Sequence, residues 1–275
     1  MKRLLFALAL LLLPGCARAD AIRIDGNLTQ GGLVIGQVAP GSSVLFEGRH
    51  VRVGAGGWFL LGFGREAPPQ ALVEATLPDG TAERLALDVA QREYDIQHID
   101  GLPDQMVTPD EALQVRIAAE RETIIAAWAH DTTATDFLGG FVWPVIGPIS
   151  GVYGSQRILN GEPRQPHFGV DMAAPEGTPV AAPAGGIVRL AEPDLYFTGG
   201  TVIIDHGHGL SSTLMHMASV AAVVGQRVEQ GDIVGTVGAT GRATGPHLDW
   251  RMNLYEARID PQLLVPPMVD SATTP

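Results

Sequence analysis

Two short segments decide how the C-terminal half of this chain folds: Pro166-His167-Phe168-Gly169-Val170-Asp171 and, later in the sequence, Gly245-Pro246-His247-Leu248-Asp249-Trp250. Side chains alternate between the two faces of an extended strand, so His167 and Asp171 point the same way, as do His247 and Asp249. A helix would also place positions four apart on one face, but the proline and glycine of the first segment disfavour one. Two such strands side by side would gather imidazoles and carboxylates around one metal ion.

Strand signals surround both segments, from about Phe141 to Leu264. Short apolar runs alternate with glycine-containing turns, a pattern typical of antiparallel strands. The strands expected here are Gly185–Leu190, Gly200–His206, Ser212–His216, Ile233–Gly238 and His247–Met252. Six of the eight histidines lie between His130 and His247, and this clustering favours a functional site on the sheet.

The N-terminal part has the pattern of a small antiparallel β-sandwich. Its alternating apolar runs are separated by turn residues, as in sandwiches built from short strands. The expected strands include Leu33–Val38, Ser43–Phe46, Trp58–Leu61 and Ala71–Ala75. His50 and His98 are isolated, so this part is interpreted as an accessory domain with a binding or spacer role.

A helix is expected between these two β regions. Thr108-Pro109-Asp110-Glu111 has the pattern of a capping box with proline at the first helical position, and apolar residues follow as far as Trp128. The fold is therefore expected to be mainly β. Its parts are a β-sandwich over 22–102, a helical linker over 103–137, an antiparallel β-sheet domain over 138–266 and a tail over 267–275.

The first residues predict an exported protein. Met1-Lys2-Arg3 is positive and Leu4–Leu13 is an unbroken apolar run, which together indicate a secretory signal over residues 1–19. The apolar run is too short for a membrane span, which needs about 20 residues. Ala17-Arg18-Ala19 offers a cleavage site, whereas Cys16 would be acylated in a lipoprotein. Either outcome places the protein in the periplasm or cell envelope, with membrane contact only if Cys16 is lipidated.

Composition limits the partners and the chemistry. The formal net charge of −12 argues against nucleic acid or an anionic membrane surface as a partner, since both reward clustered Lys and Arg. Cys16 is the single cysteine of the 275 residues, so the mature chain has neither a disulfide framework nor a thiol nucleophile.

A set of collinear motifs points to a known family. The matching segments are His167-Phe168-Gly169-Val170-Asp171, Asp205-His206-Gly207, Leu214-Met215-His216-Met217, Gly231-Asp232-Ile233-Val234-Gly235 and Gly245-Pro246-His247-Leu248. In these segments the chain resembles the LytM/lysostaphin-type zinc metallopeptidases, whose fold is the duplicated hybrid motif. The resemblance implies a peptidase that cuts peptide cross-links of bacterial cell-wall peptidoglycan with one Zn²⁺ ion on a small antiparallel sheet.

The same resemblance implies roles for individual residues. The His-x-x-x-Asp motif makes His167 and Asp171 zinc ligands, and His216 and His247 take the positions of the catalytic histidines. The family's third ligand is a histidine at the position of Asp249. Because zinc accepts carboxylate oxygen, Asp249 is expected to remain a ligand, although its charge makes the metal a weaker Lewis acid.

Two non-catalytic alternatives stay open. Some LytM-like proteins have lost metal ligands and act by activating a separate cell-wall amidase, and the substitution at Asp249 is compatible with such a regulator. A peptidoglycan-binding module without activity is the other alternative. Retention of His167, Asp171, His216 and His247 favours the enzyme.

Several neighbouring residues are expected to be structural. His206 and His208 are predicted to bond to the backbone, and Asp205 is predicted to be a turn or surface carboxylate. Trp250 and Phe168 alternate with the proposed ligands, so both are expected to pack in the core.

Overall fold

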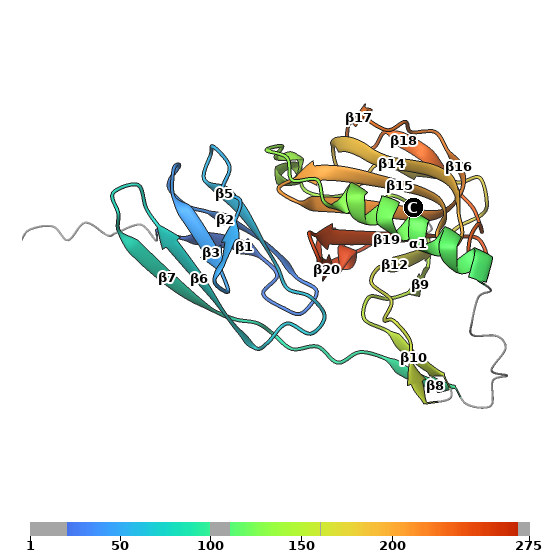
Figure 1. Ribbon diagram of the computed structural model, residues 1–275, viewed down its shortest axis with the longest axis horizontal. Helices are drawn as coiled ribbons and strands as arrows, with labels where there is room; N and C mark the ends of the chain where they lie inside the picture. Colours follow the sequence, from blue (N-terminus) through green and yellow to red (C-terminus); the bar gives the residue numbers. More distant parts are fainter. Residues whose placement is uncertain (1–20, 100–110, 160, 269–275) are drawn as a thin grey trace, which may run out of the picture.

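The computed structural model describes residues 21–99, 111–159 and 161–268. Two β-sheet units lie side by side, and one helix, α1 (Glu111–Trp128), crosses the larger of them (Figure 1). The prediction of a mainly β fold with an N-terminal sandwich, a helix and a C-terminal antiparallel sheet is confirmed. The proposed signal peptide (1–19), the first three residues of the proposed capping box (108–110) and most of the proposed tail (269–275 of 267–275) lie outside the described residues. Within the described part of the chain, no helix is long and apolar enough to cross a membrane.

The N-terminal unit is a sandwich of two antiparallel sheets. One sheet has the order β1-β2-β5 and the other the order β4-β3-β6-β7. The strands are β1 (Arg23–Gly26), β2 (Leu33–Gln37), β3 (Ser43–Phe46), β4 (Arg49–Val51), β5 (Trp58–Gly62), β6 (Gln70–Thr76) and β7 (Ala82–Asp88). Alternating residues such as Val44, Phe59 and Val73 are buried between the sheets, which explains the alternating sequence pattern.

The C-terminal unit is built on a sheet of ten strands with the main order β17-β14-β15-β16-β19-β12-β9. These strands are β9 (Ile149–Gly151), β12 (Val170–Ala173), β14 (Gly186–Leu195), β15 (Gly199–Gly207), β16 (Leu210–Val220), β17 (Arg227–Val228) and β19 (His247–Leu254). Off this path lie β13 (Pro179–Ala181), β18 (Ile233–Val237) and β20 (Ala257–Ile259). The segments that contain His167 and His247 thus lead into two neighbouring strands, β12 and β19.

A small separate sheet lies below the large one (Figure 1). It consists of β8 (Ile96–Ile99), β10 (Gln156–Leu159) and β11 (Glu162–Pro163), with β8 parallel to β10. The chain leaving the sandwich therefore pairs with the hairpin that directly precedes His167. Two short 3-10 helices, η2 (Asp136–Gly139) and η3 (Pro261–Leu263), complete the described elements.

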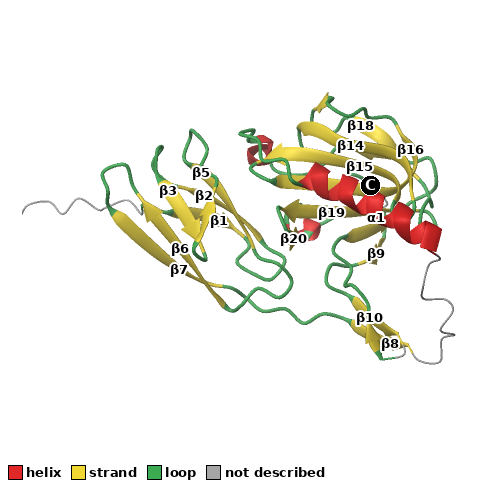
Figure 2. Cartoon of the chain, viewed as in Figure 1, coloured by secondary structure: helices red, strands yellow, loops and turns green. Residues whose placement is uncertain are grey.

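The large sheet has one face in the main core and one face under α1. Leu214, Leu248 and Trp250 are buried in the main core, and Trp250 was correctly predicted to pack there. On the other face, Trp128 of α1 donates from Nε1 to Thr213 Oγ1 at 3.1 Å. Because Thr213 pairs with Arg251 of β19, α1 packs on the face that carries the odd-numbered side chains of β19 (Figure 2).

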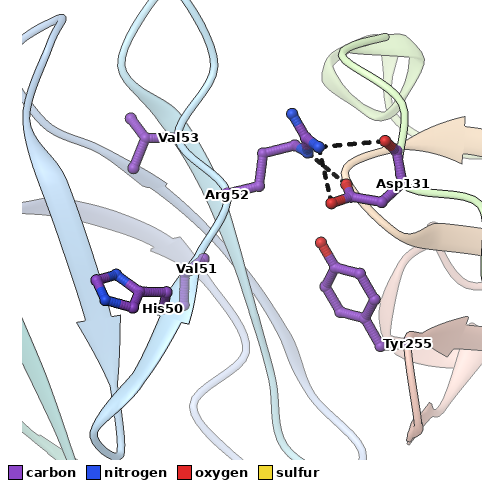
Figure 3. Close-up of a pocket in the computed structure, with 6 residues that line it drawn as sticks. All are labelled: His50, Val51, Arg52, Val53, Asp131 and Tyr255. Atoms are coloured by element: carbon purple, nitrogen blue, oxygen red, sulfur yellow. Dashed lines mark hydrogen bonds and ion pairs between the residues drawn. The ribbon is translucent and has the colours of Figure 1, made fainter.

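Direct contacts join the two units. Arg92 of the sandwich pairs with the buried Asp260 at 2.8 Å, and Leu60 of β5 is part of the main core of the C-terminal unit. Figure 3 shows a further ion pair, between Arg52 and Asp131, with Tyr255 beside it. These residues line an open crevice of about 450 Å³ between the units, together with His50, Val51 and Val53.

Two buried polar residues of β15 are structural, one as predicted and one not. His206 bonds through Nδ1 to Gly185 O at 2.7 Å, as expected for a histidine tied to the backbone. The prediction that Asp205 is a turn or surface carboxylate is wrong. Asp205 is only 2% exposed and accepts hydrogen bonds from Arg189 Nε and Nη2 at 3.1 and 2.8 Å, which compensates its buried charge.

His208 also departs from its predicted role. Its ring packs on the edge of Phe137, with centroids 5.2 Å apart. Neither ring nitrogen has a hydrogen-bond partner among the described residues, so only the backbone of His208 is tied, by donation to Thr132 O at 2.9 Å. Phe168, expected in the core, is half-buried and lies against Tyr153.

The burial of His206 predicts a loss of stability in mild acid. Burial lowers the pKa of His206, although the bond to Gly185 raises it in part. In the unfolded chain the pKa of this histidine is about 6.5. As the pH falls toward and below that value, the unfolded chain binds more protons than the folded chain. The free energy of unfolding should therefore fall between pH 7.5 and pH 5.5, and His206→Gln should flatten that slope in urea titrations. An equal slope in the variant would contradict this account.

Candidate metal centre

The site is positioned by the antiparallel pairing of β12 with β19. In this register Asp171 lies directly opposite Asp249, and Asp249 in turn lies opposite Met215 of β16. Residues opposite each other in neighbouring strands point to the same face, which here is the face that α1 partly covers. The two carboxylates are thereby brought together by backbone pairing.

His167 reaches the site from a loop. The strand predicted through it begins only at Val170, three residues later. The backbone of His167 is nevertheless fixed, since its N–H donates to Ser155 O at 2.8 Å and its carbonyl accepts from Gly154 at 2.7 Å. The loop before β12 is thus held by the segment that leads into β10.

His167, Asp171 and Asp249 form a group whose ligand-type atoms all lie within 4.8 Å of one another. His167 Nε2 is 3.2 Å from Asp171 Oδ1, and His167 Nδ1 is 4.0 Å from Asp249 Oδ2. His167 Nε2 and Asp171 Oδ1 are both buried, and neither has a hydrogen-bond partner among the described residues. Buried polar atoms are normally paired, so two such atoms facing each other fit a shared cation. The donor set, one imidazole and two carboxylates, suits zinc.

Two further histidines border this group. The rings of His216 and His247 lie with their centroids 4.8 Å apart, and His247 Nε2 is 3.9 Å from Asp171 Oδ1. Each ring bonds through Nδ1 to a backbone carbonyl, His216 to Thr240 at 2.9 Å and His247 to Gly245 at 2.8 Å. A carbonyl can only accept, so each Nδ1 carries a proton, and in the neutral form of either ring Nε2 would be the acceptor.

His216 is held in an unusual conformation. Its φ of 64° lies in the left-handed region, where a non-glycine residue is uncommon and strained. Its N–H donates to Thr198 O at 2.8 Å, which ties this residue to the β14–β15 hairpin. Burial lowers the pKa of His216, against the opposing effect of the bond to Thr240, so the imidazole is neutral near neutral pH.

Asp249 carries an arginine partner that the sequence analysis did not single out. Arg251 Nε lies 3.1 Å from each carboxylate oxygen of Asp249, and Nη2 lies 2.6 Å from Oδ2. Burial would raise the pKa of Asp249, but the charge and hydrogen bonds of Arg251 outweigh it and hold the pKa below its ordinary value. The signal was present in the sequence, since residues two apart on a strand share a face.

Three side chains of the site are partly exposed to solvent. The side chains of His167, Asp171 and His247 are 19%, 22% and 15% exposed, whereas that of Asp249 is 3% exposed. The structure brings together all five predicted site residues: Asp249, His167, Asp171, His216 and His247. The arrangement places three residues that could hold a divalent cation beside two further imidazoles, which is the composition of a hydrolytic metal centre.

The space that holds Asp249 and Arg251 depends on Gly169. A Cβ added at Gly169 would lie 2.5 Å from Asp249 Oδ1 and 2.6 Å from Arg251 Cγ. Gly169→Ala should therefore lower the free energy of unfolding by about 1–3 kcal/mol through overpacking, measured by urea denaturation. Gly245→Ala is the matched control, because a Cβ there has no neighbour within 4 Å and the change should be close to neutral. Equal stability of the two variants would contradict the packing described.

Comparison with known proteins agrees with this geometry. Residues 165–261 match the model of peptidase family M23. The DD-carboxypeptidase/endopeptidase Mpg of Neisseria meningitidis is 40% identical over 100 residues, 36% of this chain and 22% of that protein. The peptidoglycan DD-endopeptidase ShyC of Vibrio cholerae is 35% identical over 107 residues, 39% of this chain and 24% of that protein. The match thus spans less than a quarter of either curated relative.

One solved structure is similar over most of the chain. A Pseudomonas aeruginosa protein assigned to peptidase M23 is 28% identical, with a TM-score of 0.65 over 86% of this chain and 93% of that chain. The likeness extends beyond residues 165–261, so it includes the arrangement of other parts of the chain as well as the sheet that carries the site.

Proposed function

This chain carries a domain of peptidase family M23, of the LytM type, and on that premise we propose that it is a zinc metalloendopeptidase that hydrolyses peptide cross-links of bacterial peptidoglycan. The observation that carries the proposal is the pair of buried, unpartnered ligand atoms, His167 Nε2 and Asp171 Oδ1, 3.2 Å apart and beside Asp249. The similarity to proteins named DD-endopeptidase supports peptidoglycan as the substrate.

The residues divide between holding zinc and moving protons. His167, Asp171 and Asp249 would hold the ion, which when bound supplies Lewis acidity to a peptide carbonyl and to water. His216 and His247 have Nε2 atoms available to accept a proton or, once protonated, to donate a hydrogen bond to the developing oxyanion. The carbonyls of Thr240 and Gly245 fix the orientation of the two rings, so that Nδ1 is occupied and Nε2 is left for proton transfer.

The protein's cellular place is part of the proposal. The positively charged start and apolar run of residues 1–19 support export to the periplasm or cell envelope, where peptidoglycan lies. Lipid attachment at Cys16 would hold the enzyme at a membrane surface.

Digestion of purified sacculi tests the proposed activity. The protein lacking residues 1–19 should release soluble muropeptides in the presence of zinc, and a chelator should abolish the release. His216→Ala and His247→Ala should each lower the rate by about 10²-fold or more, because each removes a proton-transfer group. His50→Ala, at an exposed histidine of β4, is the control and should retain full activity.

A different result would favour the regulator. If sacculi stay intact with the native protein and with Asp249→His, the enzyme proposal fails. Stimulation of an added cell-wall amidase under those conditions would identify the protein as an activator of that partner.

A further inference from the structure

We infer that Arg251 is a positioning residue that lets Asp249 serve in place of a neutral zinc ligand. This inference rests on the proposed function and concerns one departure of this chain, the carboxylate at position 249. Asp249 and Arg251 lie on the same face of β19 and form an ion pair with three hydrogen-bond contacts. They act as one unit in the metal centre.

The charge of the centre supports this role. With Asp171 as its single carboxylate, a centre completed by neutral imidazoles carries one negative charge. Asp249 makes it two, and the guanidinium of Arg251 returns it to one. A divalent ion would then keep the net positive charge on which its Lewis acidity depends.

The strand register makes compensation necessary. Asp171 and Asp249 are directly opposed in neighbouring strands, an arrangement in which like charges destabilise the sheet. Asp249 is 3% exposed at its side chain, so water cannot screen it. Arg251 supplies the opposite charge permanently, because a guanidinium stays protonated in proteins.

The contacts with Arg251 leave one acceptor site on Asp249. A carboxylate offers about four lone-pair sites, and Arg251 takes both on Oδ2, the oxygen 4.0 Å from His167 Nδ1, and one on Oδ1, so a cation would bind through the remaining site of Oδ1. The fork of Arg251 fixes the carboxylate plane, while the absence of a side chain at Gly169 leaves room for the arginine stem. Lysine has no such fork and would hold the charge without fixing the plane.

Arg251 could have the opposite effect on metal binding, and the two effects can be told apart. Arg251 would act as a competitor if its hydrogen bonds kept Asp249 from the ion, and its removal would then strengthen metal binding. The sign of the change in zinc affinity therefore separates the two roles without any measurement of peptidase activity.

The test is a zinc titration of the protein lacking residues 1–19, against a chelating indicator. Arg251→Met should weaken zinc binding by about 10- to 100-fold, as is usual when a partner of a ligand is removed. The zinc affinity of Arg251→Lys should fall between those of the native protein and Arg251→Met. Arg189→Met is the matched control, because Arg189 holds the buried Asp205 in the same sheet but lies outside the centre, so this variant should lose stability and keep native zinc affinity in its folded fraction.

The Asp249→His background guards against simple misfolding. There Arg251 has lost the carboxylate that it bonds, and Asp171 is the single carboxylate left in the centre, so Arg251→Met should leave zinc affinity unchanged or raise it. Circular dichroism in chelator confirms that each variant is folded before titration. Tighter or unchanged zinc binding by Arg251→Met in the native background would overturn the inference and leave the proposed function standing. A native protein that binds no zinc would overturn both.

Discussion

The opposition of Asp171 and Asp249 across β12 and β19 is the constraint on which the site depends. Backbone pairing places two carboxylates on one face, where they would repel each other without positive charge nearby. His167 lies at 3.2 Å from one carboxylate and Arg251 at 2.6 Å from the other. The proximity of the two carboxylates destabilises the sheet on its own, and a divalent cation bound between them would relieve the repulsion.

The surrounding elements fix this pair and its histidines. The loop that contains Thr240 and Gly245 orients the two imidazoles, and the segment before β10 fixes the backbone of His167. Helix α1 packs on the same face through Trp128, next to the strand that carries Arg251. The β-sandwich contacts the far end of the sheet through Arg92 and Leu60, so it joins the scaffold of the domain without supplying a side chain to the metal group.

Sequence reasoning worked where a local pattern determines the outcome. Short apolar runs between turn residues predicted β2, β5, β16 and β19. Family motifs pointed to His167, Asp171, His216 and His247, which the structure brings together. The burial of a side chain and its hydrogen-bond partners depend on strands distant in sequence. Asp205 was therefore wrongly predicted to lie at a turn or the surface, because Arg189 pairs with it only in the folded sheet. Arg251 was overlooked because its importance arises from the substitution at Asp249 two residues earlier.

We expect His167, Asp171 and Asp249 to hold zinc together, with Arg251 still paired to Asp249. A crystal structure of the zinc-loaded protein, with anomalous diffraction recorded on both sides of the zinc edge, tests this most directly. One anomalous peak is expected at about 2.0–2.2 Å from His167, Asp171 and Asp249, together with an intact Asp249–Arg251 ion pair. A protein that shows no peak at these side chains, or a peak that excludes Asp249, would contradict this expectation.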